Sequence, residues 1–233
     1  MLLTPYGFRE WSIITLLCAG LGAAAFWLGG WWALIPVVLA WGALMSFFRD
    51  PPRRIRTDLG PGIMLAPADG RISAIEPHEV HPATDGPAVV VRIYLSVLNV
   101  HVNRMPCDAT IVSLDHAPGK YLDVRDPESA TVNEHLVMRI KRTGDGVAVG
   151  VKQIAGLVAR RIVNPNAPGD AFIRGQRYGM IKFGSTTELI VPDVPGLAVQ
   201  VNVGDVVRGG LTVLADLPLQ GAASPGDAAP ANA

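Results

Sequence analysis

A long apolar segment dominates the N-terminal part of the chain. Between Trp11 and Phe48 there is no Asp, Glu, Lys, Arg or His, and apolar side chains fill most positions. A membrane-spanning helix needs about 20 apolar residues, so this stretch is long enough for two helices rather than one. The pair Gly29-Gly30 provides a break near its middle. The pattern predicts a helical hairpin with helices over 12–28 and 31–48.

Two other interpretations of this segment differ in how it meets the membrane. A cleaved signal peptide has an apolar core of only about 7 to 15 residues, which is much shorter than the segment found here. A re-entrant or surface-lying hairpin stays open, because each half is close to the lower length limit of about 17 residues for a spanning helix. We expect a membrane hairpin over residues 1–48.

Arginines flank the apolar segment on both sides. Arg9 precedes it, and Arg49, Arg53, Arg54 and Arg56 follow it within a basic linker over 49–61. Cytoplasmic flanks of membrane helices carry an excess of Lys and Arg. The sequence therefore predicts a cell-membrane protein whose two flanks, and whose body after the linker, lie on the cytoplasmic side.

Downstream of the linker, short apolar runs alternate with turn residues, which is the pattern of a mostly β domain. Helices have little room in this region. The expected strands are 72–75, 89–95, 110–115, 136–142, 147–154, 162–163, 177–181, 188–191 and 211–214. We expect the β-rich domain to cover residues 62–220. The tail over 221–233 is rich in Ala, Gly and Pro, and such a composition predicts disorder.

Two stretches of the β region, 150–161 and 199–210, have a similar character. The second contains a Gly204-Asp205 turn that resembles turns in flattened barrels related to biotinyl and lipoyl domains. The predicted fold class is therefore mostly β: a flattened barrel or barrel-sandwich-like body preceded by an N-terminal helical membrane hairpin.

Composition narrows the range of functions. The chain has 20 basic and 20 acidic residues, a formal net charge of zero and a mean hydropathy of +0.31. No global positive field attracts nucleic acid, so we expect no nucleic-acid partner. The two cysteines, Cys18 and Cys107, are far apart in sequence and differently placed. They indicate neither a disulfide framework nor a metal site.

The segment Phe183–Thr186 carries the most specific chemistry in the chain. Its Gly184-Ser185 pair lies between two apolar runs, and glycine allows backbone conformations that a side chain forbids. The Ser185 hydroxyl can therefore attack the carbonyl of Gly184 and convert the peptide bond into an ester. Elimination from that ester, followed by hydrolysis, leaves a pyruvoyl group at a new N-terminus. The pattern indicates a protein that cleaves itself.

Together with three further blocks, this segment resembles the phosphatidylserine decarboxylase family, especially its short form. The blocks occur in order and are 47–53, 66–71 and 95–106. The resemblance covers roughly residues 45–215. It implies a proenzyme that cleaves itself between Gly184 and Ser185. The implied products are a β chain of residues 1–184 and an α chain of residues 185–233, which stay together as a heterodimer, with a higher homo-oligomer left open.

The resemblance also implies catalytic roles for particular residues. Ser185 becomes the covalent pyruvoyl cofactor. A serine hydroxyl is a weak nucleophile that needs a base, and the resemblance implies that His101 is this base and that Asp69 orients it. From the residues alone, His101 would be assigned to a structural position and Asp69 to a turn. No metal is expected.

Candidate substrate contacts have weaker support. Long-form members carry a second histidine where this chain has Arg104, which could meet a phosphate or carboxylate. Residues Asn133 and Glu134 begin a segment that resembles the Asn-Glu-Arg segment of the family, with His135 in place of arginine. A β-turn is an equally good interpretation of that segment. Lys182 is a further candidate, because a cationic side chain can pair with a phosphate or a carboxylate.

The expected activity is pyruvoyl-dependent decarboxylation of phosphatidylserine in the membrane. One alternative is a family decarboxylase that acts on a different serine-bearing lipid, such as an ether lipid. Another is a membrane-anchored barrel-sandwich adaptor or carrier without catalysis. The carrier interpretation expects a modified lysine in a hairpin, and Lys182 fits that pattern poorly. A conventional serine hydrolase expects a Gly-x-Ser-x-Gly elbow, which residues 183–187 do not provide.

The flanking arginines generate a prediction about topology. A cysteine inserted after Asp58 should resist labelling by a membrane-impermeant thiol reagent in intact cells and should react after permeabilisation. The physical reason is that four arginines within eight residues hold this flank in the cytoplasm. Labelling from outside intact cells would show that the orientation is wrong.

Overall fold

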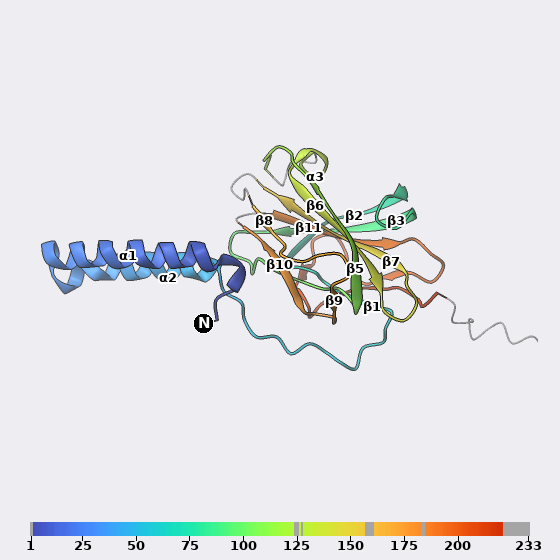
Figure 1. Ribbon diagram of the computed structural model, residues 1–233, viewed down its shortest axis with the longest axis horizontal. Coiled ribbons are helices and arrows are strands. Elements are labelled where there is room, and N and C mark those ends of the chain that lie inside the picture. Colours follow the sequence, from blue (N-terminus) through green and yellow to red (C-terminus); the bar gives the residue numbers. More distant parts are fainter. Residues whose placement is uncertain (1, 124–125, 127, 157–160, 183–184, 221–233) are drawn as a thin grey trace, which may run out of the picture.

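The computed structural model describes residues 2–123, 126, 128–156, 161–182 and 185–220. An apolar helical hairpin projects from one end of a β-rich body, and residues 49–61 run along the outside of that body (Figure 1). Phe183, Gly184 and the tail over 221–233, for which disorder is predicted, lie outside the described residues.

The hairpin has two main helices, each continuous with a short 3₁₀ turn. Their bounds are η1 Pro5–Gly7, α1 Phe8–Gly29, η2 Trp31–Ala33 and α2 Leu34–Phe47. Gly30 has a φ of 67°, a left-handed conformation that glycine adopts without strain, so the predicted break is confirmed. Helix α1 begins four residues before the predicted start, because no helix-breaking residue separates Phe8 from the apolar run.

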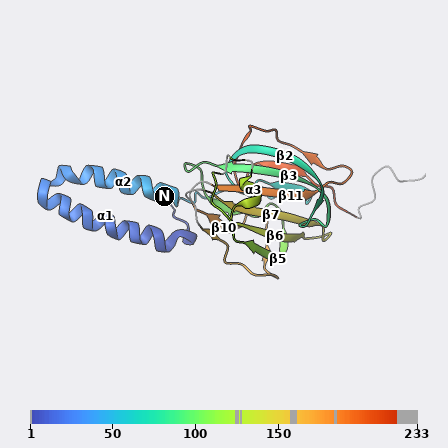
Figure 2. The ribbon, with the colours of Figure 1, turned by 90° about the horizontal axis from the view of Figure 1, so that it is seen from above.

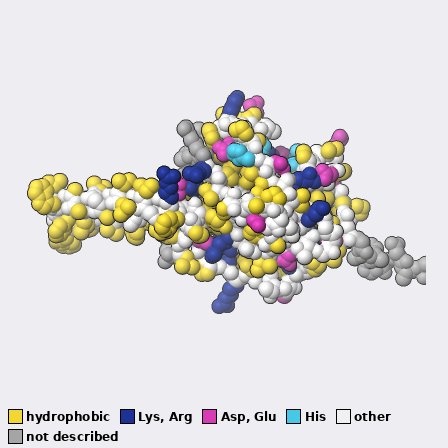
Figure 3. All heavy atoms as spheres, in the orientation of Figure 1, with side chains coloured by type: hydrophobic (Ala, Val, Ile, Leu, Met, Phe, Trp, Pro, Cys, Tyr) yellow, Lys and Arg dark blue, Asp and Glu magenta, His cyan; other side chains and the backbone are white. Residues whose placement is uncertain are grey.

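Most apolar side chains of the hairpin do not contact the body. Trp27 and Leu28 are 85% and 78% exposed, and Figure 3 shows hydrophobic side chains along this projection. Within the described residues, one helix, spanning Pro5–Gly29, is long and apolar enough to cross a membrane, and the apolar helix over Trp31–Phe47 is shorter. By length, composition and exposure, the helix over Pro5–Gly29 could anchor the body to a membrane.

The body consists almost entirely of antiparallel strands. Their bounds are β1 Ile63–Leu65, β2 Gly70–His81, β3 Gly86–Leu95, β4 Val102–Arg104, β5 Ala109–Ala117, β6 His135–Arg142, β7 Ala148–Ala155, β8 Ile162–Val163, β9 Ala171–Phe172, β10 Arg177–Ile181, β11 Ser185–Pro192, β12 Ala198–Val199, β13 Val206–Val207 and β14 Val213–Asp216. One short helix, α3 Ser129–Val132, follows β5.

The strands form one large sheet and two small ones. The large sheet has the order β13-β2-β3-β11-β7-β6-β5-β9, and the small sheets have the orders β1-β14-β12 and β4-β10-β8. Figure 2 shows β11 between β3 and β7. Alternate residues of β3 and β11, such as Val91, Ile93 and Leu189, point into the main core, which Leu214 of β14 also joins. This alternation is the period-2 pattern of a strand with one face on a core.

The mostly β fold and most of the predicted strands are confirmed. Strands β8 and β10 have the predicted bounds, and the predicted strand 211–214 is displaced to Val213–Asp216. Among the described residues the sheets do not close into a barrel; the large sheet and the β1-β14-β12 sheet instead contribute residues to one core. The predicted Gly204-Asp205 turn is present, with Gly204 at a φ of 98° and its amide donating to the Ile72 carbonyl.

The close approach of Gly70 in β2 to the backbone of β3 leads to a prediction about stability. A Cβ added at Gly70 would lie 2.2 Å from the carbonyl oxygen of Tyr94, whereas nothing lies within 4 Å of a Cβ added at Gly86. Gly70→Ala should lower the free energy of unfolding by about 1–3 kcal/mol, a typical cost of overpacking. Gly86→Ala, in the same hairpin, should change it by less than about 0.5 kcal/mol. Thermal unfolding in detergent tests this pair, and equal midpoints would contradict the prediction.

Candidate active site

Ser185 is the first residue of β11, the strand at the middle of the large sheet. Its backbone is paired with Leu95 of β3 on one side and with Ala155 of β7 on the other. The residue is fully buried, and its Oγ has no hydrogen-bond partner within the described part of the chain. Buried polar atoms almost always have a partner, so the unpartnered hydroxyl makes Ser185 a candidate for the reactive residue of the site.

His101 lies in the segment that connects β3 to β4. A turn precedes it, in which the Asn99 amide donates to the Ser96 carbonyl and the Asn99 side chain accepts from the Ser96 amide. The Nδ1 atom of His101 lies 3.0 Å from the Asn99 carbonyl oxygen. Because a carbonyl oxygen only accepts hydrogen bonds, Nδ1 carries the proton and Nε2 keeps its lone pair. That Nε2 atom is buried and also lacks a partner.

Burial keeps the His101 imidazole neutral. Loss of hydration lowers its pKa from 6.5 to about 4, while the hydrogen bond with Asn99 opposes the shift and the charge of Arg49 reinforces it. The ring of Phe47 packs against the imidazole, with centroids 4.4 Å apart. At neutral pH the site therefore holds an imidazole whose free lone pair is ready to accept a proton.

Two backbone connections hold the segments of Ser185 and His101 together. The amide of Ile181, at the end of β10, donates to the His101 carbonyl. Four residues later, Ser185 pairs with Leu95, from which the chain leads through the 96–99 turn back to His101. The structure thus brings the predicted nucleophile and the predicted base to the same end of the body.

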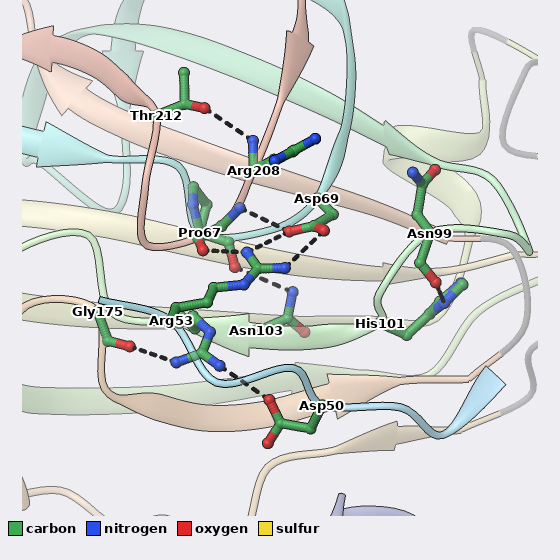
Figure 4. A network of polar contacts seen from close by, with 12 residues as sticks. Asp50, Arg53, Pro67, Asp69, Asn99, His101, Asn103, Gly175, Arg208 and Thr212 are labelled. Atoms are coloured by element: carbon green, nitrogen blue, oxygen red, sulfur yellow. Dashed lines mark hydrogen bonds and ion pairs between the residues drawn. The ribbon is translucent and has the colours of Figure 1, made fainter. Parts of the chain in front are cut away.

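Asp69 has a different partner from the one that the sequence indicates. Its carboxylate accepts two hydrogen bonds from Arg53, at 2.6 and 2.7 Å, and one from the Gly209 amide at 2.8 Å (Figure 4). The contact that orients His101 comes instead from the Asn99 carbonyl. A bidentate guanidinium–carboxylate pair is a strong, geometrically specific contact, which explains why the carboxylate lies on Arg53. The charge of Asp69 raises the pKa of His101, and the predicted role of Asp69 in orienting that histidine stays a prediction.

Arg104 is committed to protein partners. Its guanidinium donates to the Asp50 carboxylate at 2.9 Å and to the Gly175 carbonyl at 3.0 Å, and Figure 4 labels both acceptor residues. Asp50 also pairs with Arg177 at 2.6 Å. The side chains of Arg104 and Asp50 are buried, and burial lowers the pKa of Arg104. This arrangement favours a structural role, and the predicted contact with substrate stays a prediction.

Asn133 and Glu134 also have partners within the body. The Asn133 side chain donates to the carbonyls of Leu122 and Ala155 and accepts from the Leu122 amide. Glu134 accepts from the Tyr121 hydroxyl at 2.7 Å and lies 3.0 Å from a nitrogen of His116. Because Ala155 pairs with Ser185, Asn133 supports the strand beside the nucleophile. A role of either residue in substrate binding stays a prediction.

Sequence reasoning missed a buried network of amide side chains under the site. Asn103 donates to Thr187, Gln153 donates to Asn103, and Asn164 donates to Gln153. The network joins β4, β7 and β11 through side chains rather than backbone. The signal that could have revealed it is the presence of Asn and Gln inside otherwise apolar strands.

A cavity of about 260 Å³ opens beside the site. It is lined by Pro51, Pro52, Arg53, Asp69, Val100, Arg208 and Leu211. Two of the lining residues, Pro51 and Pro52, come shortly after the end of α2 in the chain, so the cavity lies close to the hairpin. Within the described ranges, no group of three or more His, Cys, Asp or Glu side chains is placed to hold a metal ion.

Fold and site together define a mostly β body with a buried serine–histidine pair, attached to an apolar helical hairpin. A family model described as phosphatidylserine decarboxylase matches residues 42–215. A protein from Nitratidesulfovibrio vulgaris is 40% identical over 222 residues, covering 94% of this chain and 97% of its own. One from Nitrosomonas eutropha is 43% identical over 188 residues, covering 80% and 84%. Both carry the name phosphatidylserine decarboxylase proenzyme.

A third relative, from Cupriavidus taiwanensis, has the same name and is 38% identical over 192 residues, covering 82% of this chain and 86% of its own. The matched region includes Asp69, His101 and Ser185. The chain belongs to the phosphatidylserine decarboxylase family, and it is an enzyme. The family resemblance predicted from the sequence is confirmed.

The buried imidazole generates a prediction about pH. Between pH 6.5 and about 4 the unfolded chain binds a proton at His101 that the folded protein does not, so the free energy of unfolding should fall as the pH falls through this range. His101→Asn should remove this contribution, whereas His78→Asn, at an exposed site, should retain it. Denaturant unfolding in detergent at pH 7 and pH 4.5 tests the difference, with wild type and both variants carrying Ser185→Ala so that all of them are single chains. Equal pH dependence in wild type and His101→Asn would contradict a buried neutral imidazole.

Proposed function

We propose that this protein is a membrane-anchored proenzyme that cleaves itself between Gly184 and Ser185 and then decarboxylates phosphatidylserine to phosphatidylethanolamine. The observation that carries the proposal is the pair of buried, unpartnered atoms, Ser185 Oγ and His101 Nε2. One is a proton donor and the other a proton acceptor, and they belong to segments tied together by the sheet. The names of the relatives support both the substrate and the existence of a precursor.

Self-cleavage begins at Ser185. His101 Nε2 accepts the hydroxyl proton as Oγ attacks the carbonyl carbon of Gly184, and the peptide bond becomes an ester while the amine of residue 185 is released. Loss of the Ser185 α proton then breaks the bond between Cβ and Oγ. The upstream chain leaves with a carboxylate at Gly184, and residue 185 becomes dehydroalanine. Addition of water releases ammonia and leaves a pyruvoyl group.

The residues around His101 suit this task. The Asn99 carbonyl fixes the Nδ1 proton, so Nε2 is the only ring atom able to act as the base. The low pKa of His101 keeps it unprotonated at neutral pH. The exclusion of water from the serine limits hydrolysis of the ester before elimination. The network of Asn103 and Thr187 holds the beginning of β11 in place.

The pyruvoyl carbonyl supplies an electrophile that takes up the electrons released with carbon dioxide. The protein's residues bind and orient the lipid headgroup. The cavity beside Val100 and Asp69 has room for a headgroup, at about 260 Å³, and lies near the end of the hairpin, where a phospholipid would arrive. The hairpin holds the body at its substrate, so two acyl chains need not leave the bilayer.

The two products of cleavage stay associated through the sheets. Strand β11, at the beginning of the α chain, pairs along Ser185–Ile190 with β7 and along Ser185–Pro192 with β3, both in the β chain. Strand β14 of the α chain pairs with β1 of the β chain. These contacts support a heterodimer of residues 1–184 and 185–233. The arginines flanking the hairpin support a body on the cytoplasmic side of the cell membrane.

Mass spectrometry tests self-cleavage. Purified wild-type protein should contain two chains, and the smaller one should begin with pyruvoyl in place of Ser185 and lack a free α-amine. Ser185→Ala removes the nucleophile and should remain one intact chain. His101→Ala should remain largely uncut, because catalysis by a positioned base is worth about 10²–10⁴-fold. A single intact chain in wild-type protein that decarboxylates phosphatidylserine would overturn the mechanism.

The substrate is tested with the same preparation in mixed micelles. Phosphatidylserine should yield phosphatidylethanolamine and carbon dioxide, and Ser185→Ala should yield neither. Faster turnover of an ether-linked serine lipid than of phosphatidylserine would shift the assignment to that lipid. An uncut chain without decarboxylation of either lipid would favour a binding role.

A further inference from the structure

An ion pair joins the membrane hairpin to the segment that is cleaved. The Lys182 Nζ atom lies 2.7 Å from a carboxylate oxygen of Glu10, and the two side chains are 8% and 32% exposed. Glu10 lies in the first turn of α1, whereas Lys182 follows β10 directly and lies three residues before Ser185. The pair therefore links the beginning of the hairpin to the strand end that leads into the cleavage site.

The burial of Lys182 makes this pair consequential. A lysine side chain is a strongly hydrated cation that is rarely buried without a partner, and removing one partner of a buried ion pair leaves an uncompensated charge. If an uncharged residue replaced Glu10, the Lys182 ammonium group would be more stable in water than in its buried position. Such a movement would displace the end of β10, four residues before Ser185.

The C-terminal end of the hairpin contacts the segment that carries His101, the proposed proton acceptor. Phe47, the last residue of α2, packs on the His101 ring, and Arg49 donates a hydrogen bond to the Leu98 carbonyl in the turn before His101. We call Glu10, Phe47 and Arg49 the hairpin base. Figure 3 shows Lys and Arg side chains where the hairpin meets the body. The hairpin base thus contacts both segments that must meet during cleavage.

We propose that Glu10 is a positioning residue for self-cleavage, which holds Lys182 so that Ser185 is aligned with His101. This inference rests on the proposed function. It makes the membrane hairpin part of the apparatus that cuts the chain, in addition to being an anchor. A chain whose hairpin has not docked on the body therefore cuts slowly.

The test measures the rate of cutting during cell-free synthesis in the presence of phosphatidylglycerol and phosphatidylethanolamine nanodiscs, by gel and intact mass. Glu10→Gln should slow cutting by about tenfold or more, because small misplacements of reacting groups have effects of this size. The charge-reversed double variant, Glu10→Lys with Lys182→Glu, restores an attractive pair and should cut within about threefold of the wild-type rate.

Asp58→Asn is the matched control. It removes the carboxylate of another ion pair, Arg56–Asp58, with a similar distance of 2.8 Å but with side chains that are 61% and 66% exposed. This variant should cut at the wild-type rate. Thermal unfolding of each variant in a Ser185→Ala background, in which no chain is cut, reports stability separately from cutting.

The outcomes separate this inference from the proposed function. Wild-type protein that stays uncut in nanodiscs overturns the proposed function itself. Wild-type protein that cuts, together with Glu10→Gln that cuts equally fast, overturns only the role of Glu10. So does a double variant that is membrane-bound and folded but as slow as Glu10→Gln. If Glu10→Gln does not accumulate, the double variant decides, with fast cutting in support and slow cutting against.

Discussion

The desolvation of the serine–histidine pair is the constraint on which the rest of the structure depends. A buried polar group without a partner destabilises a fold by about 1–3 kcal/mol, and this site has two such atoms, Ser185 Oγ and His101 Nε2. The fold offsets this by placing Ser185 on the central strand of the large sheet, above a continuous apolar core. Packing along β11 therefore offsets the cost of burying an unpartnered hydroxyl at its first residue. The same burial that leaves His101 Nε2 without a hydrogen-bond partner keeps its lone pair available.

The elements that the sequence predicted are those with strong local patterns. The hairpin follows from an apolar segment without charges, and long strands such as β3 and β6 follow from the apolar runs within them. The strands that were missed, such as β4 and β13, have only three and two residues, too few to show a period. Their existence depends on partners that are distant in sequence. The open arrangement of the sheets likewise depends on pairing that no local pattern records.

The same distinction holds within the site. Ser185 lies in a local motif, Gly184-Ser185, that carries its own chemical meaning, whereas His101 is selected through the family resemblance, because its local context alone favours a structural position. The partner of Asp69 was not accessible in this way, because its carboxylate meets Arg53 and the amide of Gly209, which is 140 residues away. Arg53 had been assigned only to a basic linker. Its place in the block 47–53 was the available signal, but no spacing rule connects it to Asp69.

The position of β11 affects how the protein can fold before and after the proposed cleavage. Before cleavage, residues on both sides of the cut belong to one chain, and their pairing in the sheet is an intramolecular event. In the proposed mature form, unfolding separates two chains, and reassembly becomes a bimolecular process whose success depends on protein concentration. In that form the pyruvoyl end could not revert to serine, so the original single-chain folding route would be lost. Under the proposed function each molecule folds once as a single chain, and its later persistence depends on slow unfolding.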